Sequence, residues 1–391
     1  MFDTHEHQQL RETTRRLIDE HVNPYCDEWE EAGRFPAHEV FKKFGDAGLL
    51  GITKPEAYGG LGLDYSYEVA FAEELGHVAA GAVSMAIGVQ TDMCTPALAE
   101  HGSDELRREW LAPSIAGDLV GCIGVTEEGS GSDVSSVKTF AKKDGDDYLI
   151  SGNKMFITNG MQADWMCMLC NTAEEDGPHH NKSLIVVPLD AKGVTRDGPL
   201  KKLGMHASDT ARLYFDEVRV PQRHRIGEEN RGFIYQMEQF QEERLLGSAK
   251  SICFLEDIIH ETIEYTRQRQ AFGQSILDNQ VVHFKLAEMQ TEVETLRALT
   301  YRAVEKYVAG EDVTKLASMA KLKTGQLTQT IPSACLQFWG GQGFLAENRV
   351  SRVYRDTRVA SIGGGANEVM LQVICKQMGI LPKRRGWPHN E

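Results

Sequence analysis

The stretch VVHFKLAEMQTEVETLRALTYRAVEKYV, residues 281–308, decides the fold of the second half of the chain. Its apolar and small residues recur at steps alternating between four and three, the spacing of the buried seam of a bundle helix. Gly310 follows, as expected just beyond a helix C-terminus. We therefore predict a long helix that packs against other helices of the same subunit or of another. The seam consists of Val282, Leu286, Met289, Val293, Leu296, Thr300, Ala303 and Tyr307.

Outward from this helix, the pattern changes twice along the chain. Residues 233–391 keep helical spacing, and residues 1–119 are rich in Ala, Leu, Glu and His with the same periodicity. Residues 120–232 instead hold short β-type runs between Gly, Asp and Asn clusters, which predicts an antiparallel β-sandwich or barrel. The sequence therefore predicts an α+β multidomain fold with helical, β and helical domains in that order. The β-type runs are Tyr148–Ile150, Met166–Cys170, Leu184–Pro188 and Leu213–Phe215.

The composition limits which binding partners and which cell compartment we expect for this protein. The 391 residues include 42 Lys plus Arg against 57 Asp plus Glu, a net charge of −15. Such a surface repels phosphate backbones and anionic lipid heads, so we expect no nucleic-acid and no membrane partner, although a local basic pocket still suffices for an anionic small ligand. No apolar run reaches the length of about 18 residues that a membrane span needs. The polar start of the chain and eight scattered cysteines indicate a cytoplasmic protein.

Several common sites are disfavoured by missing residues. Gly60–Gly62 and Gly129–Gly131 both lack the third glycine of G-x-G-x-x-G, which argues against a Rossmann site. The sequence also contains no P-loop, no H-E-x-x-H and no G-x-S-x-G. Cys167 and Cys170 form a C-x-x-C in an apolar strand-like run, where residues three apart point to opposite faces. We interpret them as buried strand cysteines and predict no metal site.

Five polar or glycine-rich segments are candidates for ligand binding. GVTEEGSGSD (124–133) offers hydroxyls and exposed backbone N–H groups to the carbonyl or phosphate oxygens of a ligand. An ordinary polar turn without a ligand would have the same composition. In KMFITNG (154–160) an aromatic residue precedes a hydroxyl by two positions and could stack on a flat ring, or end a strand. RQRQAFG (267–273) could clamp a pyrophosphate or complement a helix dipole. QFWGGQGF (337–344) and IGGGANE (362–368) permit close backbone approach, or end and begin helices.

In this order and at these spacings, the five segments resemble the acyl-CoA dehydrogenase family over essentially the whole chain. KLGMHASDT (202–210) and FDEVRVP (215–221) also fit. The resemblance implies an N-terminal all-α domain (1–119), a middle antiparallel β-sandwich or barrel domain (120–232) and a C-terminal four-helix-bundle domain (233–391). It further implies a homotetramer with one FAD per subunit, held partly by a neighbouring subunit.

The resemblance assigns FAD contacts by motif. The first segment should line the flavin ring and contact its phosphate, and Phe156 should stack where the family usually has Trp. Thr158 should hydrogen-bond near N5, and the two segments in the region 267–344 should hold the FAD of the adjacent subunit. The implied FAD-binding residues are Ile123, Val125, Thr126, Gly131, Ser132, Phe156, Ile157, Thr158, Arg269, Phe272, Gln280, Gln337, Gly340, Gly341, Ala366, Asn367 and Glu368.

The catalytic base departs from the commonest family pattern. Many members have Tyr-Glu-Gly-Thr before the last helix, whereas this chain has Gly-Gly-Gly-Ala at 363–366, so the base position is Gly364. In a branch that resembles isovaleryl-CoA and long-chain acyl-CoA dehydrogenases, the Glu comes from another helix, immediately before an Arg. Glu243 and Arg244 match that arrangement, so we assign Glu243 as the base, the alternative being a solvated helix carboxylate. The implied substrate contacts are Ser132, Gln241, Arg244 and Gly364.

The reaction that the resemblance implies is α,β-dehydrogenation of an acyl-CoA, with the electrons passed to an electron-transfer flavoprotein. The backbone N–H of Gly364 should stabilise the developing enolate oxygen. QEERLLG (241–247) together with IGGGANE resembles bacterial citronellyl-CoA dehydrogenases, which suggests a branched isoprenoid or a medium- to long-chain substrate. The alternatives are an acyl-CoA oxidase, a short branched-chain dehydrogenase of the isovaleryl type, a related monooxygenase or nitroalkane oxidase, and a non-enzymatic scaffold of the same fold.

Overall fold

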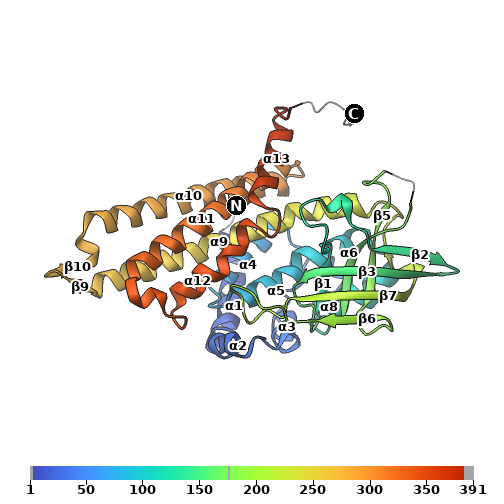
Figure 1. Ribbon diagram of the computed structural model, residues 1–391, viewed down its shortest axis with the longest axis horizontal. Helices are drawn as coiled ribbons and strands as arrows, with labels where there is room; N and C mark the ends of the chain where they lie inside the picture. Colours follow the sequence, from blue (N-terminus) through green and yellow to red (C-terminus); the bar gives the residue numbers. More distant parts are fainter. Residues whose placement is uncertain (1–2, 175–176, 383–391) are drawn as a thin grey trace.

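The computed structural model describes residues 3–174 and 177–382. Within these ranges, helices come first, a sheet follows, and long helices complete the chain (Figure 1). The long helices lie at one end of the longest axis and the sheet at the other, with the first helices packed between and below them (Figure 1). This order confirms the predicted helical, β and helical layout. The final part of the expected C-terminal domain, 383–391, lies outside the described residues.

The N-terminal region is a set of short helices whose apolar faces meet in one core. In α3 the buried residues Ala37, Val40, Phe41 and Phe44 follow the i, i+3, i+4, i+7 spacing of an amphipathic helix. Phe44 meets Phe71 of α4 edge-on at 6.2 Å between ring centroids. The elements are α1 (His5–His21), η1 (Asn23–Tyr25), α2 (Cys26–Ala32), α3 (Ala37–Asp46), η2 (Glu56–Tyr58), α4 (Tyr65–Leu75), α5 (Gly81–Gly88), the π-helix η3 (Val89–Cys94), α6 (Pro96–His101), α7 (Asp104–Leu106), η4 (Arg107–Leu111) and α8 (Ala112–Ile115).

The middle region is a mixed sheet with the order β6-β7-β3-β2-β4-β5-β8. Most neighbouring strands pair antiparallel as predicted, but β4 pairs in parallel with β1 and, through Phe140 and Asn171, with β2. The β2–β3 hairpin lies between β1 and β4 in the sequence. This long connection allows the chain to enter β4 in the same direction as β1, so that the two strands pair in parallel. The elements are β1 (Gly121–Gly124), η5 (Val134–Ser136), β2 (Phe140–Asp144), β3 (Asp147–Ile157), β4 (Trp165–Asn171), β5 (Lys182–Pro188), β6 (Val194–Asp197), β7 (Ala211–Pro221), η6 (Gln222–His224) and β8 (Arg225–Ile226).

Strand β4 is buried on both faces, and its cysteines divide between them. Cys167 packs in one core with Trp165 and Leu169, whereas Cys170 packs with Met166 in another. Both thiols are buried, and burial raises the pKa of each to about 12. The prediction of buried strand cysteines on opposite faces is therefore confirmed.

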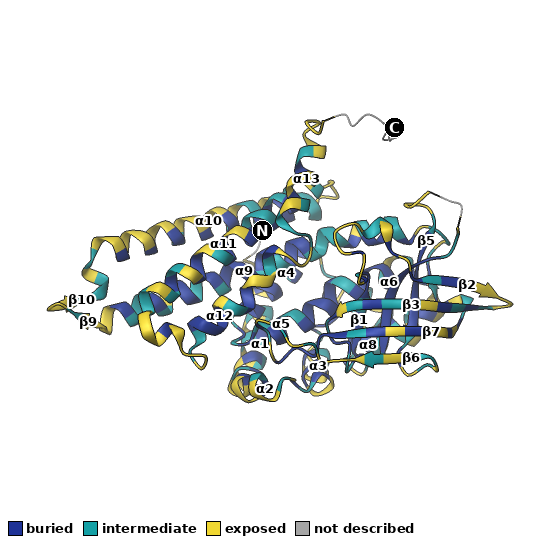
Figure 2. Ribbon diagram, in the orientation of Figure 1, coloured by how far each residue is buried: buried dark blue, intermediate teal, exposed yellow. Residues whose placement is uncertain are grey.

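The C-terminal region consists of three long helices with shorter ones packed against α11. The predicted seam is confirmed: its residues from Val282 to Ala303 are buried, and Tyr307 donates a hydrogen bond to Glu242 Oε1 at 2.7 Å. The opposite face of α10 is exposed (Figure 2). The elements are α9 (Gly232–Gln268), β9 (Gln270–Ala271), β10 (Gln274–Ser275), η7 (Ile276–Asp278), α10 (Gln280–Val308), α11 (Thr314–Trp339), η8 (Gly340–Phe344), α12 (Arg349–Thr357), η9 (Arg358–Ser361) and α13 (Asn367–Gln377).

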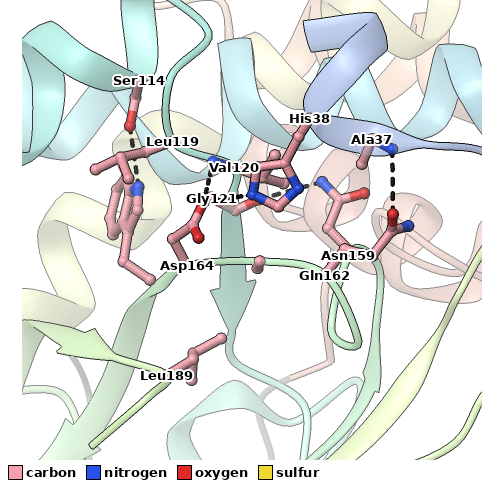
Figure 3. A network of polar contacts seen from close by, with 12 residues as sticks. Ala37, His38, Ser114, Leu119, Val120, Gly121, Asn159, Gln162, Asp164 and Leu189 are labelled. Carbon is pink, nitrogen blue, oxygen red and sulfur yellow. Dashed lines mark hydrogen bonds and ion pairs between the residues drawn. The ribbon is translucent and has the colours of Figure 1, made fainter. Parts of the chain in front are cut away.

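Polar contacts hold the start of the sheet against the N-terminal helices (Figure 3). The Asp164 carboxylate accepts from the N–H of Val120 at 2.7 Å and lies 2.9 Å from Nε2 of His38. The Asn159 amide donates to the carbonyl of Gly121 at 3.1 Å. These contacts place the first residue of β1 beside the turn that follows β3.

A second joint connects all three regions through one carboxylate. Asp356 of α12 accepts from the N–H of Met205 at 2.5 Å and from the N–H of Gly81 at 3.2 Å. Burial raises the pKa of Asp356 to about 6. Because Gly81 begins α5 and Met205 lies between β6 and β7, the three regions pack as one body around this residue.

No described helix is both long enough and apolar enough to cross a membrane.

The seam of α10 generates a stability prediction. Leu296 is fully buried, so Leu296→Ala should cost about 2–5 kcal/mol of unfolding free energy and lower the Tm in a thermal-shift measurement. Thr295→Ala is the matched control, because Thr295 is exposed on the same helix. Equal Tm values for the two variants would contradict the packing described here.

Candidate active site

Glu243 and the glycine turn before α13 meet at one point. A Cβ built on Gly364 would lie 2.9 Å from Glu243 Oε1, closer than side chains approach. The carboxylate therefore stands in the space that a side chain at 364 would need. Gly364 and Gly365 have φ of 65° and 97°, the left-handed conformation that favours glycine. Among the described backbone hydrogen bonds, the N–H of Gly364 makes none, so it remains available to an acceptor.

Burial and two cations set the charge state of this carboxylate. Burial raises the pKa of Glu243, while the nearby cations Arg244 and Lys321 lower it, and the net direction is upward. Arg244 is itself buried, donates to Ser318 Oγ at 3.4 Å and lies 5.9 Å from the centre of the Phe240 ring. A raised pKa suits a group that must take up a proton.

The neighbouring carboxylate of Glu242 points elsewhere. Its Oε1 accepts from Tyr307, and its backbone carbonyl accepts from the Tyr65 hydroxyl at 2.8 Å. Glu242 therefore faces α10 and α4, whereas Glu243 faces α11 and the glycine turn, as expected for adjacent residues about 100° apart on a helix. Gln241 has a buried amide oxygen without a partner among the described residues.

The first two candidate segments lie side by side. The N–H of Met155 donates to the carbonyl of Thr126 at 2.8 Å, which brings Ile123, Val125 and Thr126 against Phe156, Ile157 and Thr158. Phe156 is 62% exposed and has φ of 60°, a strained conformation for an aromatic residue. Gly131 and Ser132 follow on an exposed loop.

The third and fourth segments form a separate group at the other end of the molecule. Arg269 and Phe272 lie at the β9–β10 hairpin, which Figure 1 shows at the opposite end of the long axis from β2. The ends of α9 and α11 meet there, because Tyr265 stacks on Trp339 at 4.1 Å between centroids. The exposed residues of this group are Arg269, Phe272, Gln280, Gln337, Gly340 and Gly341. One subunit does not bring them to the segments around Thr126 and Phe156.

The residues present fit an aromatic, phosphate-bearing cofactor. Phe156 presents an exposed ring, and no atom lies within 4 Å of a Cβ built on Gly131, Gly340 or Gly341, so backbone is open to close approach. Asn367 has a buried side-chain oxygen without a partner among the described residues. Ala366 is half-buried beside it, and Glu368 is exposed.

Two of the four buried lysines among the described residues, Lys154 and Lys321, lie at the candidate site. Lys154 donates to Glu127 Oε1 at 2.8 Å and to the carbonyls of Val125 and Leu169 at 3.1 and 2.7 Å. The Lys154 ammonium lowers the pKa of the Glu127 carboxyl against the effect of burial. Lys154 lay within a quoted segment, but a single lysine carries no local sign of burial, and the same holds for Lys321 in α11.

Three family models match successive parts of the chain. They describe the N-terminal, middle and C-terminal domains of acyl-CoA dehydrogenase and match residues 4–118, 122–218 and 230–379. The long-chain specific acyl-CoA dehydrogenase, mitochondrial, of Rattus norvegicus is 37% identical over 374 residues, which cover 95% of this chain and 86% of that protein.

Solved structures agree with these matches. The crystal structure of an acyl-CoA dehydrogenase from Geobacillus kaustophilus superposes with a TM-score of 0.92 at 36% identity, covering 96% of this chain and 98% of that one. A glutaryl-CoA dehydrogenase from Mycobacterium smegmatis in complex with FADH2 superposes with a TM-score of 0.90 at 27% identity, covering 98% and 97%.

The buried Glu127–Lys154 pair can be tested by removing its cation. Lys154→Met leaves a buried carboxylate without its cation, which should cost about 3–5 kcal/mol, and it frees the carbonyl of Val125. We expect a lower Tm and less flavin absorbance per subunit in the purified protein. Lys142→Met, on the exposed edge of β2, is the control and should change neither value. Identical melting of both variants would refute the role of the pair.

Proposed function

The chain belongs to the acyl-CoA dehydrogenase family and is an FAD-dependent oxidoreductase of acyl-CoA, and we propose that Glu243 is its catalytic base. The observation that carries this proposal is the 2.9 Å distance between Glu243 Oε1 and a Cβ built on Gly364. The carboxylate stands where a base on residue 364 would begin. A carboxylate carried by either position could therefore serve one reacting carbon, and in this chain the carboxylate comes from Glu243.

The reaction requires removal of a weakly acidic α-proton. Glu243 takes up that proton, and its raised pKa reduces the gap between the carboxyl and the carbon acid. The free N–H of Gly364 donates to the thioester oxygen, where negative charge develops. FAD, when bound, takes up the two electrons that leave with the β-hydrogen, so that a trans double bond forms between the α- and β-carbons.

The remaining assigned residues hold the two ligands. Arg244 and Gln241 lie on α9 beside the base and offer donors and an acceptor to the acyl-CoA, together with Ser132 from the loop after β1. Phe156 and Thr158 hold the flavin from β3 and the turn after it. Their exposed or unpartnered groups support these roles.

The test is anaerobic titration of the holoenzyme with acyl-CoA, followed by bleaching of the flavin absorbance. Glu243→Gln should keep its yellow flavin but lower the bleaching rate by about 10²–10⁴-fold, because general-base catalysis contributes that much. Glu242→Gln is the matched control, since Glu242 faces Tyr307 instead. Bleaching of Glu243→Gln at the wild-type rate would show that another group is the base.

We also propose that the substrate is branched close to its reacting carbons, as in an isoprenoid acyl-CoA of the citronellyl type. Support comes from Gly247, which lies one turn after Glu243 on the same face of α9. No atom lies within 4 Å of a Cβ built on Gly247. Gly247 itself is half-buried, so this open space lies on the partly exposed side of α9.

Other helical glycines show that close packing does not explain Gly247. A Cβ on Gly45 would lie 2.4 Å from the backbone of Ala116, and one on Gly325 would lie 2.1 Å from Asn367 Oδ1. Glycine inside a helix costs about 0.5–1 kcal/mol relative to alanine. At Gly247 no described neighbour requires that cost, and the space it leaves beside the base suits a methyl branch.

The open space beside Gly247 can be filled with side chains of increasing size. Gly247→Ala should stabilise the helix, and Gly247→Val should lower kcat/KM for a 3-methyl-branched acyl-CoA by about tenfold or more relative to a straight chain of equal length. The ratio of the two substrates within each variant is the internal control. If Gly247→Val leaves that ratio unchanged, the space beside Gly247 is not part of the acyl site.

We further propose a homotetramer in which a second copy completes each FAD site, with an electron-transfer flavoprotein as electron acceptor. The exposed group around Arg269 and Phe272 supports this, because one subunit holds it apart from the flavin segments. Reoxidation of reduced enzyme by the flavoprotein but not by air distinguishes this proposal from an acyl-CoA oxidase.

A further inference from the structure

A lysine in α11 is buried beside the base without a carboxylate in salt-bridge contact. Lys321 is 5% exposed, and no ion pair of the described residues includes it within 4.0 Å. Lysine is seldom buried in this way, because the ammonium loses its hydration. Burial lowers the pKa of Lys321 to about 8, and Glu243 acts in the opposite direction.

The Lys321 ammonium donates hydrogen bonds to backbone carbonyls of the glycine turn. It donates to the carbonyl of Ala360 at 2.6 Å and to the carbonyl of Gly365 at 3.2 Å. These two carbonyls lie on either side of Gly364 in the chain. Lys321 therefore fixes both ends of the turn that presents the free N–H of Gly364.

The same side chain lies near the carboxylate of Glu243. The Cε of Lys321 lies 3.3 Å from a Cβ built on Gly364, and Glu243 Oε1 lies 2.9 Å from that point. Arg244 of α9 and Lys321 of α11 are the charged groups that act on Glu243 among the described residues, while the turn contributes carbonyls. One ammonium thus contacts the turn and faces the base.

We propose that Lys321 is a positioning residue. It fixes the position of the Gly364 N–H relative to the Glu243 carboxylate, and it keeps that carboxylate ionised. The inference rests on the proposed role of Glu243 as base. It also explains the burial of a lysine that makes no ion pair: its charge acts on the ionised base and on the oxygen at which negative charge develops.

The experiment measures the rate of flavin reduction by acyl-CoA against pH, with the FAD-loaded enzyme and stopped-flow detection. Lys321→Gln removes the positive charge but keeps a hydrogen-bond donor. Because Glu243 then loses a stabilising cation, the acid limb of the pH–rate profile should move up by about one pH unit or more. The limiting rate should fall about tenfold with little change in KM. Lys321→Arg keeps the charge and should keep the wild-type limb.

The controls separate this role from a structural one. Lys323→Met, on the same helix and paired with Glu292, should leave the profile unchanged. If Lys321→Gln lowers the Tm or the rate but leaves the acid limb in place, the residue is only structural and the proposal is overturned. Should that variant fail to fold, an acid limb displaced in Lys321→Arg would overturn it equally. Wild-type bleaching by Glu243→Gln would instead overturn the base assignment itself, and this inference with it.

Discussion

The carboxylate of Glu243 on α9 fills the space in which a side chain at position 364 would begin, and the arrangement of the site depends on this close approach. Glu243 Oε1 lies 2.9 Å from where a Cβ on Gly364 would stand. Gly364 therefore does more than permit a left-handed turn, because its lack of a side chain makes room for the carboxylate of Glu243, the proposed base. The glycine-rich segment and the glutamate are one feature of the molecule, although 120 positions separate them in the chain.

The fold holds these two elements in place from several directions. Helix α9 runs from beside β5 to the β9–β10 hairpin and packs against α4, α10 and α11 along its length (Figure 1). Asp356 connects α12 to the Met205 and Gly81 backbones, and Lys321 ties the glycine turn to α11. Because the proposed base, the glycine turn and the proposed flavin segments lie on different elements, the distances between them depend on packing rather than on any single loop.

Buried charge is distributed unevenly around the site. Beside the proposed flavin segments, Lys154 pairs with Glu127 and donates a hydrogen bond to the carbonyl of Val125. Around the proposed base, Lys321 and Arg244 are the two cations that act on the carboxylate of Glu243, in a protein that is acidic as a whole. That local field suits an anionic ligand and an oxygen that gains negative charge during the reaction.

The sequence alone determined what depends on local spacing. The steps of four and three predicted the seam of α10, alternation placed Cys167 and Cys170 on opposite faces, and the ordered motifs indicated the family. Only the tertiary structure decided the parallel pairing of β1 with β4, the burial of Lys154 and Lys321, and the open space beside Gly247. Periodicity records which face of an element is apolar, but it does not record what a lysine or a glycine meets, because that partner lies far away in the chain.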